Sequence, residues 1–568
     1  MRVRSLVPIL VTVGLAACAG PTAPPAPAVP FSVVEASIAD MQQAMADGRV
    51  TSRQLVEQYL QRIALYEERV NATLAVNATA LAEADRLDAE RRAGRVRGPL
   101  HGIPIALKDN VHTTDLPTTG GAAAFEGFVP PYEATLTTHL REAGAIVLAK
   151  TVLTELANFI AQGMPGNYSA LGGYGLNPYD PRRDPRQATA DGRPVASTGG
   201  SSSGIGTAMN FWAANVGTET SGSILSPSNQ NMLAGIKPTV GRVSRYGVIP
   251  ITADQDTAGP MAKYVADAAA LLGAMEGAAP DPHDPATSTC TPPPNRDYTV
   301  HLKREALKGA RIGIPRAFYY DRITVAGEKE PRGGLNEAQA AAMAEAIAVL
   351  KAAGAEIVDP ADIPSVVETD PAKNVLAWGT CSGTDGAKGR DANCSVVLKY
   401  GMKRDFNLWL ATLGAAAPVK TLAELRAWNT AHASRGAIKY GQANLDVSDE
   451  MDVDEDRARW DADRTKDVWL AGTHGIDEVL AAHQLDALLF PGASGAAIAA
   501  KPGYPTVIVP FALVANAPTP PLPDGFAARP IPYGVSFSAG ACSEPRLIEL
   551  AYAFEQATRK RTPPPGFP

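Results

Sequence analysis

The residues best suited to chemistry are serines in two short stretches of small residues. The first stretch reads GGSSSG and spans 199–204, and the second reads TSGS and spans 220–223. Gly/Ser runs alone behave as flexible linkers, but the segment between these two, IGTAMNFWAANVG, is apolar enough to be buried. A serine can act as a nucleophile when a neighbouring base takes its proton. We therefore expect both stretches to lie inside one folded body rather than between two.

One interpretation is a Ser-His-Asp hydrolase. Residues 200–204 satisfy G-x-S-x-G, a motif that requires a strand before it, a helix after it, and an acid and a histidine downstream. The preceding segment, DPRRDPRQATADGRPVAST, has loop composition and almost no strand character. The histidines available downstream are His432, His474 and His483, each in a helical context. The five-residue match keeps an α/β-hydrolase-type enzyme as an alternative.

A lysine offers a second way to activate serine. Lys108 ends the apolar run Ile103 to Leu107 in GIPIALKDN, so its side chain leaves a strand expected to be buried. Serine–lysine pairs are a recognised variant of the serine triad. Such a lysine has to be neutral, and desolvation favours that form. A lysine at a strand end is more often only a solvated terminus, so the interpretation needs further residues.

Those residues form a recognisable set. The stretches GIPIALKDN, TGGSSSG and GTETSGSILSPSNQNMLAGIKPTVGRVS resemble the amidase signature family, in the family's order. Further matching stretches are GYGLNPYDP, DTAGPMAK, GYPTVIVP and FSAGACSEPRLIELAYAFEQAT. The similarity covers most of residues 36–560. It implies hydrolysis of carboxamides without a cofactor, by a Ser–cis-Ser–Lys triad, on small acyl amides or peptide C-terminal amides.

The resemblance also assigns roles by position. Lys108 matches the base, Ser201 the bridging serine after a cis peptide bond, and Ser223 the nucleophile. The oxyanion hole would use the backbone N–H groups of Thr220, Ser221, Gly222 and Ser223. Two departures stand out. The separation 223 − 201 = 22 is two shorter than the family's usual spacing, which leaves Ser202 as an alternative to Ser201. Ser221 also stands where many members have Gly or Asp, so the substrate cannot be inferred there.

The hydrophobic pattern predicts an α/β fold. Strands are expected at 73–77, 102–110, 145–151, 485–492, 504–510 and 533–540, and helices after Thr51 and at 78–94, 336–354 and 545–559. Continuous apolar strands separated by helices indicate a sheet covered on both faces. With the family's architecture, this predicts a large mixed β-sheet with helices on both faces. Residues around 360–455 carry few strand signals and are expected to form a peripheral insertion that, with residues 163–179, walls the substrate pocket.

The N-terminus indicates export. Residues 1–18 combine two arginines, an apolar run and the lipobox-like ending Leu-Ala-Ala-Cys18, and residues 19–35 form a Pro-rich tether before a single amidase domain at 36–568. Lipidation of Cys18 would place the protein in the periplasm or on the outer membrane of a Gram-negative bacterium. A plain cleaved signal peptide, giving a secreted protein, is the alternative.

Composition limits the partners. The net charge is −7 and the pI is near 5.7, which argues against nucleic acid as a partner. The eight histidines show no paired ligand spacing and the cysteines no CxxC, so no metal is expected. We expect an amide substrate, no cofactor, and membrane contact only through the N-terminal lipid. The oligomeric state stays open, and a non-catalytic surface lipoprotein with this fold is a further alternative.

The remaining cysteines predict one disulfide bond. Cys381 and Cys394 bracket a loop rich in Gly, Asp and Asn that can bring the two sulfurs together. Cys542, between the last strand and the last helix, is expected to be a buried free thiol. Cys290, in a Pro-rich loop, is expected to be left unpaired.

Overall fold

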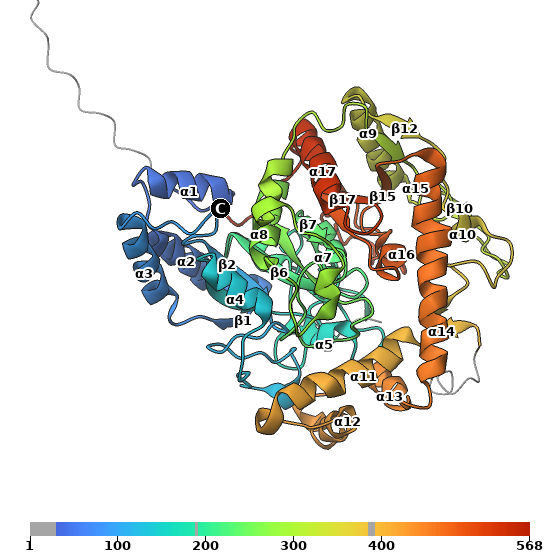
Figure 1. The fold of residues 1–568 in the computed structure, drawn as a ribbon, viewed down its shortest axis with the longest axis horizontal. Helices are drawn as coiled ribbons and strands as arrows, with labels where there is room; N and C mark the ends of the chain where they lie inside the picture. Colours follow the sequence, from blue (N-terminus) through green and yellow to red (C-terminus); the bar gives the residue numbers. More distant parts are fainter. Residues whose placement is uncertain (1–29, 188–190, 384–391) are drawn as a thin grey trace, which may run out of the picture.

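The computed structural model describes residues 30–187, 191–383 and 392–568, with one mixed sheet of eleven strands at its centre (Figure 1). Across the sheet the strands are β1 (Thr73–Val76), β3 (Ile146–Thr151), β2 (Pro104–Lys108), β6 (Ala214–Glu219), β8 (Thr257–Ala262), β7 (Ala234–Lys237), β16 (Thr506–Val514), β17 (Ile531–Ser538), β15 (Ala487–Pro491), β9 (Arg311–Gly313) and β12 (Glu356–Val358). The sheet contains both parallel and antiparallel strand pairs, which confirms the predicted α/β class with a large mixed sheet.

Helices pack on both faces of this sheet. The longer ones are α1 (Ile38–Ala46), α2 (Ser52–Val70), α3 (Ala80–Arg92), α4 (Thr135–Glu142), α8 (Val265–Met275), α9 (Glu337–Ala352), α11 (Val397–Thr412), α12 (Leu422–Ala431), α14 (Arg457–Val468) and α17 (Glu544–Thr558). In β16, Ile508 packs with Leu225 of the short helix α7 (Leu225–Gln230), whereas Val507 and Val509 face the main core with Phe554 of α17. Because neighbouring strand residues point to opposite faces, α7 and α17 cover the two sides.

Strands β2 and β6 bring the predicted catalytic residues together at the side of the sheet where both strands end. They are parallel neighbours, with Ala106 opposite Asn215 and Leu107 opposite Val216. All residues of both strands are buried, as expected for strands covered on both faces. Their carboxyl ends therefore point the same way, and Lys108 at the end of β2 lies beside the last residues of β6.

Residues 360–455 form mostly helices and loops. They include α10 (Pro364–Val367), α11, α12, α13 (Ala443–Asp449) and the short parallel pair β13 (Gly379–Thr380) and β14 (Cys394–Ser395). Helix α11 packs on the core through Phe406 and Trp409, which contact Phe125. Figure 1 shows α11 to α13 together at one end of the molecule, away from α9 and β12.

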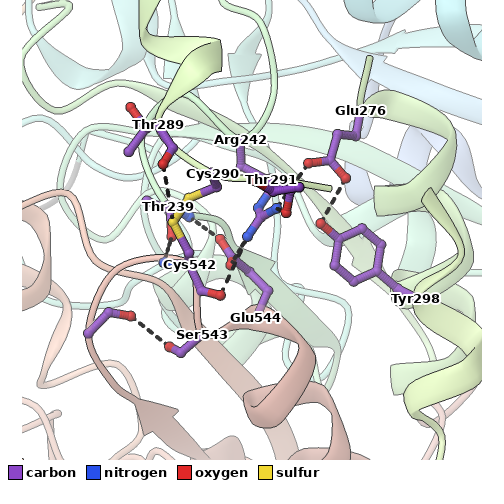
Figure 2. The surroundings of a disulfide bond; sticks show 11 residues. Thr239, Arg242, Glu276, Thr289, Cys290, Thr291, Tyr298, Cys542, Ser543 and Glu544 are labelled. Atoms are coloured by element: carbon purple, nitrogen blue, oxygen red, sulfur yellow. Dashed lines mark hydrogen bonds and ion pairs between the residues drawn. A yellow bond between two sulfur atoms is a disulfide. The ribbon is translucent and has the colours of Figure 1, made fainter. Parts of the chain in front are cut away.

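Four cysteines form two disulfide bonds. Cys381 is bonded to Cys394, with Cα atoms 5.0 Å apart. Cys290 is bonded to Cys542 across a sequence separation of 252 residues (Figure 2). The expectation that Cys542 is a free buried thiol and Cys290 unpaired is therefore wrong. The Pro-rich loop folds back onto the corner before α17, where the buried Arg242 side chain contacts Glu276 and Glu544.

The predicted export signal lies outside the described residues, as do Cys18 and most of the tether. The first described residue is Pro30, shortly before α1. Among the described residues, no helix combines the length and the apolar character that crossing a membrane requires.

Candidate active site

Lys108 is completely buried at the end of β2. Its Nζ donates to Ser201 Oγ at 2.8 Å, to Thr218 Oγ1 at 2.7 Å and to the Thr218 carbonyl at 3.3 Å. Burial lowers the pKa of Lys108 to about 7, although the nearby carboxylates of Asp256 and Glu219 act to raise it. A lysine with this pKa is half neutral near pH 7, so it can accept a proton.

The serines of the GGSSSG loop have different partners. Ser201 offers its hydroxyl to Lys108. Ser202 instead bonds to the backbone of β6, donating to the Thr218 carbonyl at 3.0 Å and accepting from the Thr218 N–H at 3.1 Å. The structure therefore brings Ser201, and not Ser202, to the lysine.

The peptide bond before Ser201 differs from the expectation drawn from the family. Among the described residues, the cis peptide bonds precede Pro360 and Pro520. The expected cis bond between Gly200 and Ser201 is therefore wrong for this structure. The loop turns at Gly199, whose φ is +95°, and this turn presents the Ser201 hydroxyl to Lys108.

Glycine is required where the two serine stretches meet. A Cβ atom on Gly200 would lie 2.9 Å from Ser223 Cα, and one on Gly199 would lie 2.4 Å from Pro227 Cα. The backbone of Ser202 donates to the Ser223 carbonyl at 3.2 Å. GGSSSG is thus a tightly packed loop against the second stretch and not a linker.

The second stretch forms the turn after β6. Ser223 is 9% exposed, and Ser221 is exposed beside it. Within the described part of the chain, the N–H groups of residues 220–223 have no intramolecular acceptor, so they are available to an external oxygen. The hydroxyls of Ser201 and Ser223 make no hydrogen bond with each other among these residues.

Residues that the sequence did not single out hold this turn. Asp256 accepts from the Thr220 hydroxyl at 2.5 Å, and Gln255 Nε2 donates to the Thr220 carbonyl at 3.1 Å. Burial raises the pKa of Asp256 to about 6. Asp256 begins the stretch DTAGPMAK, which carried the family resemblance but no assigned role. Thr218 likewise lies in a stretch that carried the family resemblance, without an assigned role, because its contact to Lys108 depends on strand pairing.

The two segments expected to wall the pocket meet. Tyr174 of β5 (Gly173–Tyr174) and Tyr440 share a hydrogen bond of 2.6 Å, and Lys439 donates to the Tyr174 hydroxyl at 2.6 Å. Gly166 also packs against Gly199, since a Cβ on it would lie 2.3 Å from the Gly199 carbonyl oxygen. The 163–179 segment therefore connects residues 439–440 to the GGSSSG loop.

The histidines of the alternative hydrolase lie elsewhere. His432 Nδ1 contacts the Trp428 carbonyl at 2.8 Å, and His474 Nδ1 contacts Glu478 at 2.7 Å. The His483 carbonyl accepts from Arg311. None of the three hydrogen-bonds to a serine of either stretch in the described chain, so the structure assembles no Ser-His-Asp arrangement from them.

Comparison with known proteins identifies the family of this chain. The Amidase family model matches residues 54–548. A probable amidase from Arabidopsis thaliana is 34% identical over 94% of this chain and 92% of its own. The crystal structure of an amidase family protein from Bacillus anthracis is 30% identical, covers 94% of this chain and 92% of its own, and superposes with a TM-score of 0.76. The structure of native peptide amidase from Stenotrophomonas maltophilia is 37% identical, covers 94% of this chain and 99% of its own, and has a TM-score of 0.76. The chain therefore belongs to the amidase signature family and is a hydrolase that acts on amide bonds.

Proposed function

We propose that the protein hydrolyses carboxamides through an acyl-enzyme, with Ser223 as nucleophile, Ser201 as proton relay and Lys108 as base. The observation that carries this proposal is the 2.8 Å contact between Lys108 Nζ and Ser201 Oγ, at a lysine whose pKa is about 7. A buried lysine of this kind can serve as a general base near neutral pH.

The reaction begins with attack of Ser223 Oγ on the amide carbon. Ser201 takes the Ser223 proton as it passes its own proton to neutral Lys108, and the C–O bond forms. The negative charge on the former carbonyl oxygen is stabilised by backbone N–H groups of residues 220–223, which have no other acceptor among the described residues. The tetrahedral intermediate then collapses: the C–N bond breaks, and the relay returns the proton to the leaving amine or ammonia. Water repeats these steps to release the acid and restore Ser223.

For the substrate, we propose small acyl amides or peptide C-terminal amides. The support is the likeness to the peptide amidase of Stenotrophomonas maltophilia, which extends over 94% of this chain.

Release of ammonia and amines from aliphatic, aromatic and peptide amides tests this function. Ser223→Ala and Lys108→Ala should abolish release while the protein stays folded, and Ser203→Ala is the matched control within the same loop. A fluorophosphonate probe should add once to the wild type, at Ser223, as measured by intact mass. Full activity of Ser223→Ala, or an adduct at another serine, would refute the proposed nucleophile.

We further propose that the enzyme works outside the cytoplasm, held to a membrane by a lipid on Cys18. The bonds Cys290–Cys542 and Cys381–Cys394 support an oxidising compartment. Metabolic labelling with palmitate should tag the wild type and not Cys18→Ser. Equal labelling of both proteins would contradict the anchor.

A further inference from the structure

Glu219 is the last residue of β6 and lies directly before the catalytic turn. Its side chain is 1% exposed, although a carboxylate is costly to bury without partners. Its Oε2 accepts from the N–H of Ile224 at 2.7 Å and from the N–H of Leu225 at 2.9 Å. These are the two residues that follow Ser223. One carboxylate therefore bridges the two ends of the four-residue turn 220–223.

This bridge determines which N–H groups of the turn stay available. Glu219 takes the donors at 224 and 225, and the Gly222 carbonyl accepts from the Ser226 N–H at 2.8 Å. The N–H groups of residues 220–223 remain without an acceptor among the described residues. Gly222, with φ of +89°, lets the chain reverse within this short distance. The carboxylate thus holds the turn closed while the N–H groups of residues 220–223 have no acceptor among the described residues.

The charge of Glu219 also acts on buried lysines around it. It favours the charged form of Lys108 on β2 and of Lys237 on β7, where Lys237 donates to the Tyr504 carbonyl. Lys108 additionally faces Asp256, and Lys237 faces Glu544. The second oxygen of Glu219, Oε1, has no hydrogen-bond partner among the described residues.

We propose that Glu219 is a positioning residue for amide hydrolysis: its carboxylate fixes the turn that carries Ser223 and the oxyanion-binding N–H groups. This role rests on the proposed function of Ser223 and Lys108. Its hydrogen bonds among the described residues are to backbone N–H groups, so Glu219 acts through the backbone of the turn.

Two substitutions separate the hydrogen bonds from the charge. Glu219→Ala removes the acceptor, so kcat should fall by about 100-fold with KM little changed, because a displaced reacting group costs about that much. Glu219→Gln keeps an acceptor oxygen but removes the charge. It should retain kcat within about threefold, and the acid limb of its kcat/KM profile should move below the wild-type position near pH 7, since one of the two carboxylates that raise the pKa of Lys108, the other being Asp256, has lost its charge.

Glu555→Gln is the matched control, because Glu555 is also a buried carboxylate that accepts a backbone N–H, from Val265 at 2.8 Å, but at the start of α8. It should leave kcat and the pH profile unchanged. Thermal melts confirm that each rate refers to folded protein. Wild-type kcat in Glu219→Ala, equal losses in Glu219→Ala and Glu219→Gln, or an unmoved acid limb in Glu219→Gln would overturn the proposal. If Ser223→Ala stays active, the proposed function fails instead, so the two failures are distinguishable.

Discussion

Gly200 passes so close to Ser223 that a Cβ atom on it would lie 2.9 Å from Ser223 Cα and 3.0 Å from the Gly222 carbonyl oxygen. Both contacts are with backbone, so neither can be relieved by rotating a side chain. The close packing of the GGSSSG loop against Ser223 therefore requires a residue without a Cβ atom at position 200.

Gly200→Ala should lower kcat/KM by about 100-fold, because the loop and the turn have to separate and the catalytic groups lose their geometry. Steady-state hydrolysis of one amide measures this. Gly379→Ala serves as the control, since a Cβ there would have nothing within 4 Å. An unimpaired Gly200→Ala enzyme would show that this approach is not needed for catalysis.

Ser201→Ala and Ser202→Ala should separate catalysis from stability. The Ser201 hydroxyl contacts the lysine, so its loss should abolish hydrolysis with little change in unfolding. Ser202 bonds to both backbone groups of Thr218. Its replacement should cost about 1–3 kcal/mol of unfolding free energy, because a buried N–H loses its acceptor. Activity assays and denaturant melts report the two effects, and the reverse pattern would make Ser202 the bridging serine.

The pH dependence should follow Lys108. The lysine has to be neutral to accept a proton, so kcat/KM should rise as pH increases through about 7 and stay high at mildly alkaline pH. Below this range, Lys108 is protonated and the relay is blocked. Lys108→Arg, which cannot lose its proton, should be inactive at every pH. Loss of activity on histidine modification would contradict a relay without histidine.

The two disulfide bonds should contribute unequally to stability. In the chain-entropy model, the Cys290–Cys542 bond, with a separation of 252 residues, contributes about 5 kcal/mol, and the Cys381–Cys394 bond, with a separation of 13, contributes about 3 kcal/mol. Denaturant unfolding of the two double Cys→Ala variants compares these values. Non-reducing peptide mapping should recover each pair linked, and alkylation of all four cysteines without prior reduction would refute both bonds.

The sequence alone predicts those parts of the site that lie on long apolar runs or in recognisable stretches. Lys108 follows a buried run, and Ser201 and Ser223 belong to stretches of small residues, so their types and order suffice to find them. Strands β1, β2, β3, β15, β16 and β17 are found for the same reason, whereas β6, β8 and β7 at the centre of the sheet are not predicted. Strand β12 at one edge of the sheet and its neighbour β9 have three residues each, which is too short for a periodic signal.

The residues that support the site could not be predicted in this way. Glu219 matters because its side chain folds back onto the N–H groups of Ile224 and Leu225. Asp256 reaches the turn because β6 pairs with β8, which brings residue 219 opposite Thr257. Nothing local marks such pairings. The same holds for Cys542, whose partner lies far away in sequence, whereas the Cys381–Cys394 loop is short enough to suggest its own closure.

The long disulfide bond also sets an order of events during biosynthesis. Cys290, Cys381 and Cys394 all leave the ribosome before Cys542. If Cys290 forms a disulfide bond before Cys542 has been synthesised, its partner can only be a cysteine other than the native one. The native bond can form only after β17 has been synthesised and the corner between β17 and α17, which carries Cys542, lies next to the Pro-rich loop. Formation of the Cys290–Cys542 bond is thus a late step, because it requires a chain that already includes residue 542.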